Sequence, residues 1–296
     1  MRKLFPAPWT REKTRGYKFA LGIFFCAALL PLFLAATICA QTPLVTAPLT
    51  SANAAASAPA MAPLAQARKS VGDFFEQSAN VVCTESITQV IVGKNDKPAY
   101  REESKYDYQL QASTISGSLK LQESRDVRKQ AFRDASRTLL ITKGFASLLL
   151  IVHPQYESSY EFEPAGEENE GTVTLAKFNF KPVPGASSPA AMQLRGKNYP
   201  LPLSGAIWID KSTGAITRLT AAVDSSLSDL GLKEMRSDIH YALVQFHDPD
   251  EAYWMPVSAT IELETPLQHW RNVHRFTAYR RFRALIEIEG LKEQKK

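Results

Sequence analysis

The chain has 296 residues, of which 45% are apolar, which is enough to fold around a core of its own. Its formal net charge of +5 comes from residues 1–40, which hold six of the 35 basic residues and one of the 30 acidic residues, so that 29 of each sign remain elsewhere. A neutral remainder argues against nucleic-acid binding, and we expect no nucleic-acid partner.

The N-terminus has the order of a secretory signal, because residues 19–40 are uncharged and hydrophobic and follow a basic segment. The small residues near Ala40 predict cleavage there. The stretch is also long enough to remain as an uncleaved membrane anchor. Lipidation at Cys39 is a weaker alternative, because Ile38 is large for that signal. We therefore expect export across the cytoplasmic membrane, with the protein periplasmic and either soluble or anchored by residues 19–40.

The next segment, residues 41–63, is rich in Ala, Pro, Ser and Thr and contains no charge. Such a composition buries too little apolar surface to fold by itself, and it predicts a flexible linker. The sequence thus predicts three parts: a signal peptide or anchor (1–40), a linker (41–63) and a folded domain (64–296).

The folded domain opens with an amphipathic pattern that predicts a helix up to about Asn80. Apolar residues recur there at steps of three and four, with charged residues between them. The apolar positions are Leu64, Ala67, Val71, Phe74, Phe75 and Val82.

Strand patterns follow, and the clearest runs from Tyr100 to Leu110, where alternate residues predict one buried and one wet face. Further strand pairs flank turns rich in Gly, Asn, Asp and Pro. The expected strands are 84–92, 100–111, 118–127, 156–163, 172–181, 206–210, 215–223, 233–246, 253–264 and 270–288. Because no strand–helix–strand alternation appears, we predict a mainly β fold built as an antiparallel meander.

Residues 145–152 break this pattern with a continuous apolar run between Gly144 and Pro154. The run is too short to span a bilayer and lacks polar alternation, so we expect a buried short helix or central strand. It could be an ordinary core segment or a cover over an apolar cavity.

No common catalytic or metal-binding motif occurs in the sequence, and we predict no enzyme activity, catalytic residue, metal or cofactor. Cys83 is the only cysteine beyond the leader, and we expect it to be a small buried residue. The competing hypothesis is an enzyme in which an exposed Cys83 is paired with a histidine such as His153.

The last strand has apolar residues of one parity and arginines of the other. The arginine face could bind an anionic partner, or it could pair with acids such as Glu262 and Glu264 on a neighbouring strand. The candidates for an anionic partner are Arg271, Arg275, Arg281 and Arg283.

The order of these elements, with the hairpin 206–210 (Ala-Ile-Trp-Ile-Asp) and 214–219 (Gly-Ala-Ile-Thr-Arg-Leu), resembles the outer-membrane lipoprotein carrier superfamily, which includes a periplasmic lipoprotein-localisation factor. Segments 199–205, 253–256 and 265–275 resemble a group of uncharacterised exported bacterial proteins. The superfamily resemblance implies an incomplete β-barrel covered by the N-terminal helix and the apolar segment 145–152.

The same resemblance implies a non-catalytic cell-envelope protein that binds an apolar ligand, either an acyl chain or a lipoprotein. The cavity residues would then include Phe74, Phe75, Leu148, Leu149 and Trp208. The alternative is a structural or interaction module of the envelope with a fully packed core. In either case the membrane would be contacted through the N-terminal segment.

Overall fold

The fold is built on one large antiparallel sheet of ten strands, in the order β4-β3-β2-β14-β13-β12-β11-β10-β7-β6. The computed structural model describes residues 19–21, 51–77, 80–115, 118–130, 140–142, 144–194, 197–223, 227, 231–247 and 250–281. The ten strands are β2 (Asn80–Val92), β3 (Pro98–Ile115), β4 (Ser118–Gln130), β6 (Tyr160–Glu170), β7 (Val173–Pro182), β10 (Leu203–Asp210), β11 (Ile216–Val223), β12 (Glu234–His247), β13 (Asp250–Glu264) and β14 (His269–Arg281).

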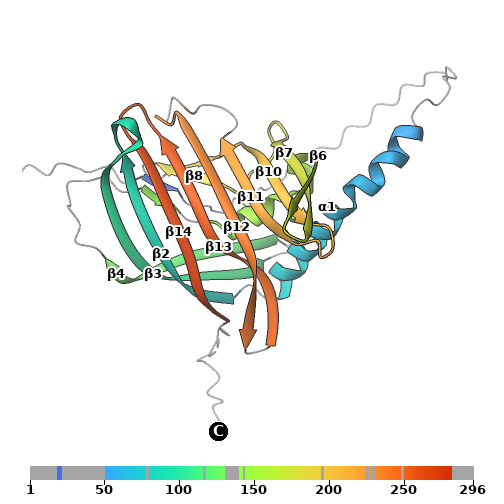
Figure 1. Ribbon diagram of the computed structural model, residues 1–296, viewed down its shortest axis with the longest axis horizontal. Helices are drawn as coiled ribbons and strands as arrows, with labels where there is room; N and C mark the ends of the chain where they lie inside the picture. Colours follow the sequence, from blue (N-terminus) through green and yellow to red (C-terminus); the bar gives the residue numbers. More distant parts are fainter. Residues whose placement is uncertain are drawn as a thin grey trace, which may run out of the picture.

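The sheet curls strongly but stays open, because its end strands β4 and β6 do not pair with each other (Figure 1). Register shifts interrupt the ladders, for example between Thr277 and Arg280 of β14, where Ala278 has a positive φ of 54°. Such bulges bend strands and increase their twist. The predicted antiparallel fold with an incompletely closed barrel is confirmed.

In residues 100–110 the predicted alternation agrees with which side chains of the strand are buried. Tyr108 and Leu110 are buried in β3, whereas Arg101, Glu103 and Lys105 are exposed. The same period of two places apolar residues of the other central strands on the concave face. That face is the core of the protein.

A second, smaller sheet has the order β5-β1-β8-β9, with β1 (Phe19–Leu21), β5 (Leu140–Thr142), β8 (Ala191–Leu194) and β9 (Lys197–Pro200). The short strand β1 pairs in parallel with β5 and antiparallel with β8. Residues 1–18 and 22–50, which contain most of the expected signal peptide or anchor, lie outside the described residues. Among the residues that are described, no helix combines the length and hydrophobicity needed to cross a membrane.

One long helix, α1 (Ser51–Gln77), runs from the concave side of the sheet out beyond its edge (Figure 1). It begins inside the segment for which composition predicts a linker, and it includes Pro59 and Pro63. The alanine-rich sequence has high helix propensity, which the compositional argument for a linker does not weigh. The predicted apolar stripe, from Leu64 to Phe75, is buried as expected, whereas Val82 belongs to β2.

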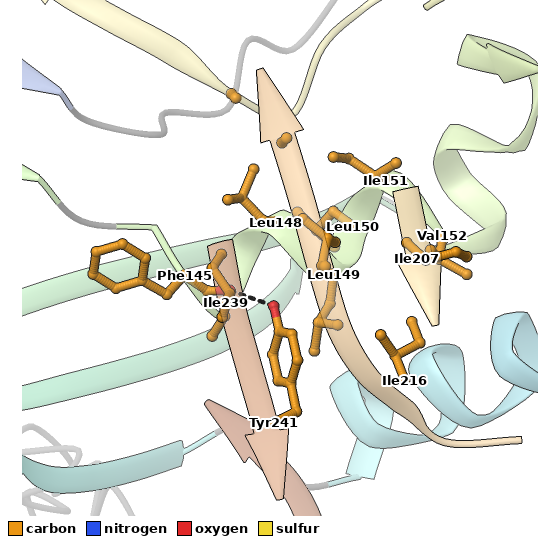
Figure 2. Packing of buried hydrophobic residues seen from close by; sticks show 14 of the residues in the cluster. Phe145, Leu148, Leu149, Leu150, Ile151, Val152, Ile207, Ile216, Ile239 and Tyr241 are labelled. Atoms are coloured by element: carbon orange, nitrogen blue, oxygen red, sulfur yellow. Dashed lines mark hydrogen bonds between the residues drawn. The ribbon is translucent and has the colours of Figure 1, made fainter. Parts of the chain in front are cut away.

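The apolar run 145–152 lies against the concave face, with the short 3-10 helix η2 (Ser147–Ile151) at its centre (Figure 2). All eight of its residues are buried, as the sequence predicts. A second 3-10 helix, η3 (Pro154–Ser159), occupies the start of the predicted strand 156–163, so β6 begins only at Tyr160. The hairpin turn between β2 and β3 contains the 3-10 turn η1 (Lys94–Asp96).

Candidate functional site

A pocket of about 190 Å³ lies between α1, η2, the turn that joins β10 to β11, and strands β12 and β13. Its wall is mostly apolar and partly aromatic. It is lined by Ser70, Val71 and Phe74 of α1, Leu149 of η2, the turn residues Thr213, Gly214 and Ala215, Ile216 of β11, Tyr241 of β12, and Ala252, Tyr253 and Trp254 of β13. An apolar cavity of roughly 150 Å³ is enough to bind benzene. The pocket can therefore accept a ring-sized apolar group or a segment of an acyl chain.

Aromatic contacts hold the β13 side of this pocket. The rings of Phe74 and Tyr253 lie 5.6 Å apart, and Tyr253 lies 5.9 Å from the ring of Phe246. The Tyr253 hydroxyl donates a hydrogen bond of 2.7 Å to Glu251, and the guanidinium of Arg281 lies 5.8 Å from the Tyr253 ring. Tyr253 therefore presents an apolar ring to the pocket while its polar end is paired outside it.

The turn between β10 and β11 forms the floor on which α1 rests. Asp210 accepts hydrogen bonds from the backbone N–H of Ser212 and from the hydroxyls of Ser212 and Thr213, which fix the turn. Gly214 has a φ of +71°, and a Cβ there would meet the side chain of Gln66 at 2.3 Å. Glycine is thus needed both for the turn conformation and for the close approach of the helix.

The segment that carries Leu149 is held in place by hydrogen bonds at its N-terminal end. The Tyr241 hydroxyl donates a hydrogen bond of 2.9 Å to the carbonyl of Phe145 (Figure 2). Glu123 of β4 accepts hydrogen bonds from the backbone N–H groups of Gly144 and Ser147, at 2.5 and 3.2 Å, and from the Ser147 hydroxyl at 2.7 Å. The carboxylate therefore satisfies N–H groups at the start of η2 that have no partner within the helix.

Beside this segment, the core contains a chain of buried polar side chains. His274 Nδ1 lies 2.8 Å from Glu85 Oε1, and His274 Nε2 lies 2.8 Å from the Thr142 hydroxyl. Arg125 donates from both Nε and a terminal nitrogen to Glu85. On the other side, Asn272 donates to Thr142 at 3.2 Å, and Gln89 donates to Asn272 at 2.8 Å.

The charge states of these hydrogen-bonded side chains follow from their burial and their pairing. Burial alone would raise the pKa of Glu85, but the Arg125 guanidinium and the hydrogen bonds from His274 and Arg125 outweigh it and hold that pKa below its usual value. Burial lowers the pKa of His274, and the Glu85 carboxylate offsets only part of this effect. At neutral pH the core thus holds an ionised Arg125–Glu85 pair beside a neutral imidazole.

The residues predicted to line a cavity divide into three groups. Phe74 and Leu149 line the pocket. Phe75 and Leu148 are buried in the main core beside it. Trp208 lies on the other face of β10, in a separate cluster with Leu175 and Ala206.

Trp208 is enclosed by charged side chains on that outer face. Its indole N–H donates a hydrogen bond of 2.8 Å to Glu168, and its ring lies between Lys177 Nζ, at 4.8 Å, and the guanidinium of Arg218, at 4.6 Å. Because Ile207 and Ile209 belong to the main core, Trp208 must point away from it. Its position is that of a packed residue of the outer surface.

The arginines of the last strand are partly neutralised. Arg271 donates to Glu262 at 2.5 Å, which is the pairing with Glu262 that the sequence suggests. Arg281 pairs with Glu251 at 2.5 Å, whereas Glu264 pairs with Lys233. Arg275 is exposed, and Arg283 lies outside the described residues. The four arginines do not form a continuous unpaired stripe within the part of β14 that is described.

The hypothesis of a cysteine enzyme does not fit the geometry. Cys83 is 1% exposed and is hydrogen-bonded to Tyr279 rather than to a histidine. Burial, followed by the Glu85 charge, raises the pKa of its thiol to about 12. His153 instead accepts a hydrogen bond of 3.0 Å from the backbone N–H of Gln155 at the start of η3. Cys83 is therefore a buried thiol, as first expected, and not a nucleophile paired with His153.

The sequence does not single out several of the residues that line the pocket. The aromatic pair Tyr253 and Trp254 occurs at the start of a predicted strand, where it is indistinguishable from ordinary core. Tyr241 is hidden in a long apolar strand in the same way. Gly214 is the pocket residue that the sequence does mark, because a glycine in a turn is typical of a positive φ and of a point where another segment can approach the backbone closely.

The sequence matches no protein-family model and no curated protein. Solved structures similar to this open-sheet fold are proteins of the LolA superfamily, a DUF1329 family and an outer-membrane lipoprotein-sorting domain, all at low sequence identity.

The DUF1329 family protein is from Desulfovibrio piger, is 13% identical, has a TM-score of 0.36, and the match covers 77% of this chain and 95% of its own. The LolA superfamily protein from Nitrosomonas europaea is 10% identical, with a TM-score of 0.37 and coverage of 75% and 94%. The lipoprotein-sorting domain described for Vibrio parahaemolyticus is 13% identical, with a TM-score of 0.34 and coverage of 76% and 93%.

Proposed function

We propose that this chain is a non-catalytic protein of the cell envelope that binds an apolar ligand, such as an acyl chain, in the pocket beneath α1. The observation that supports the proposal is the pocket itself, about 190 Å³ in volume and walled by Phe74, Leu149, Tyr241 and the β13 aromatics. Ligand pockets are concave and mostly apolar with few polar groups. Beside its aromatic residues, the wall has two polar side chains, Ser70 and Thr213.

The envelope location is supported by the N-terminal sequence, whose basic segment and uncharged stretch 19–40 have the order of an export signal. In this account the chain acts in the periplasm, either free after cleavage near Ala40 or held at the membrane. The alanine-rich segment before the domain, part of which extends α1, would then space the pocket from the membrane.

The second candidate is a packed interaction module, and one observation favours it. The concave face is covered by the fully buried run 145–152 together with the inner face of α1, so the pocket is small by the standard of ligand sites of roughly 300–1,000 Å³. Such a protein would bind its partner through its surface rather than its interior.

The two candidates are separated by filling the pocket without removing core contacts. Ala252 lines the pocket and is exposed, so Ala252→Phe adds a ring to the pocket at little cost to the fold. Ala186, which is exposed in the loop after β7, provides the control Ala186→Phe.

The assay is a fluorescence titration with N-phenyl-1-naphthylamine, a neutral apolar probe. We expect saturable binding to the unmodified chain and to Ala186→Phe, with at least tenfold weaker binding to Ala252→Phe. Equal binding to all three chains, or none to any, would exclude the pocket as the site and favour the interaction module.

A further inference from the structure

The hydrogen-bond chain around His274 has only one consistent direction when the imidazole is neutral. Arg125 donates to Glu85, which keeps this carboxylate ionised and therefore an acceptor for His274 Nδ1–H. The Nε2 atom of His274 then carries no proton and must accept from the Thr142 hydroxyl. Thr142 in turn accepts from Asn272 Nδ2, whose oxygen accepts from Gln89. In this direction these bonds each join a donor to an acceptor.

A second proton on His274 breaks this order at Thr142. Nε2–H would become a second donor to the Thr142 oxygen beside Asn272, and the Thr142 proton, which donates to Nε2 in the neutral form, would lose its acceptor. Thr142 is 2% exposed, so water cannot readily replace the lost partner. The added positive charge would also be buried, a cost that the Glu85 carboxylate offsets only in part and that the nearby Arg125 charge increases.

The strand that contains Thr142 leads directly into the pocket wall. Thr142 ends β5, and η2 with Leu149 follows within a few residues. The ring of Phe145 lies 4.6 Å from the His274 ring, and its carbonyl accepts from Tyr241, which also lines the pocket. His274 therefore contacts the segment 142–149 at both Thr142 and Phe145.

From this arrangement we propose that His274 is a pH-sensitive fastening for the segment 142–151, and that acidification releases this segment and with it one wall of the pocket. The inference deepens the proposed function by giving the pocket a mode of regulation, and in that respect it rests on that function. The fastening itself exists in the chain with or without a ligand.

The direction of the pH dependence follows from the neutral imidazole of the fastened form. Burial lowers the pKa of His274 below 6.5 there, and release would restore the ordinary value. The fastened form is thus fully stable above about pH 6.5. It loses stability as the pH falls below that value, until the lowered pKa is reached.

The other titratable groups around the His274 hydrogen-bond chain come from four strands. They are Cys83 and Glu85 of β2, Tyr108 of β3, Glu123 and Arg125 of β4, and Tyr279 of β14. The Cys83 thiol and the two tyrosines have a raised pKa because of burial, and Glu85 has a lowered one. These four shifts move titration away from the interval between pH 5 and 7.5.

The test is hydrogen–deuterium exchange of peptides covering 142–151 in the ligand-free full chain at pH 7.5, 6.5 and 5.5, corrected for the pH dependence of chemical exchange. We expect corrected exchange to quicken by up to about tenfold per pH unit below pH 6.5, since release takes up one proton. His274→Gln should abolish this dependence, and His153→Gln should retain it. Unchanged protection from pH 7.5 to 5.5, or the same dependence in His274→Gln, would overturn the proposal.

Thr142→Val is a second variant, which tests the same role of His274 if His274→Gln does not fold. Valine keeps the shape but cannot donate to Nε2, so the neutral imidazole loses a stabilising bond and its pKa in the fastened form rises toward the ordinary value. Corrected exchange of 142–151 should therefore be faster than in the unmodified chain at pH 7.5 and should rise less steeply below pH 6.5. The same exchange rate at pH 7.5 with the same pH dependence as in the unmodified chain would contradict the assigned role. Probe binding at pH 7.5 is measured separately, and its failure would reject the proposed function without altering the exchange result.

Discussion

His274 Nδ1 and Glu85 Oε1 lie 2.8 Å apart, although the two residues are separated by 189 positions and neither side chain is exposed to solvent. The contact exists because the last strand of the sheet, β14, pairs with the first, β2. The pair is a buried polar contact between the two ends of the folded chain, within the row of buried polar side chains that also includes Gln89, Asn272 and Thr142. Arg125 of β4 joins the pair from two strands away.

The Arg125–Glu85 pair predicts a large and asymmetric response to substitution. Arg125→Gln leaves an uncompensated carboxylate in the core, and we expect it to lower the free energy of unfolding by about 3–5 kcal/mol in urea denaturation. The double variant Glu85→Gln/Arg125→Gln should cost less than the sum of the two single variants. The control is Arg101→Gln, which breaks an exposed pair with Glu103 and should leave stability unchanged within error. Strict additivity would mean that the pair is not coupled.

The contact between α1 and the β10–β11 turn predicts that Gly214→Ala is destabilising. The substitution forces a non-glycine residue to a φ of +71° and moves the Gln66 side chain, for an expected cost of about 1–3 kcal/mol. Gly171→Ala, at a φ of +60° with nothing within 4 Å, measures the conformational part alone. Adding Gln66→Ala to Gly214→Ala should recover the difference between the two. If Gly214→Ala and Gly171→Ala cost the same, the helix does not rest on Gly214.

Cys83 predicts a thiol that does not react in the folded chain. With Cys26→Ser and Cys39→Ser it becomes the single cysteine, and its raised pKa of about 12 leaves very little thiolate at pH 8. We expect its reaction with an aromatic disulfide reagent to be at least about a hundredfold slower in buffer than in guanidinium chloride. Rapid stoichiometric labelling of the folded chain would show that Cys83 is accessible, and it would reopen the hypothesis of a cysteine enzyme.

The fold is predictable from the sequence where a local pattern coincides with a face of the sheet. The alternation in β3, the stripe of α1 and the apolar run 145–152 each mark buried surface directly. The helix start at Ser51 is not predicted, because the composition of residues 41–63 suits a linker while alanine also favours a helix. β6 starts late because Pro154 begins a 3-10 turn.

The site is less predictable, because it depends on contacts between distant segments. Phe74 and Leu149 stand out as apolar cover residues, but the face of Trp208 depends on which parity of β10 meets the core. The polar chain from Gln89 to Arg125 draws on β2, β4, β5 and β14, and no spacing within any one of these strands reveals it. In a single strand, His274 and Asn272 look like interruptions of an apolar face.

The most direct test of the central claim, that the pocket beneath α1 holds an apolar ligand, is native mass spectrometry of the full chain purified from a bacterial envelope, followed by organic extraction and lipid analysis. We predict a co-purifying acyl lipid on the unmodified chain and on Ala186→Phe, and its loss from Ala252→Phe, with all three chains equally folded by circular dichroism. A ligand-free mass for the unmodified chain, or the same lipid on Ala252→Phe, would contradict the claim.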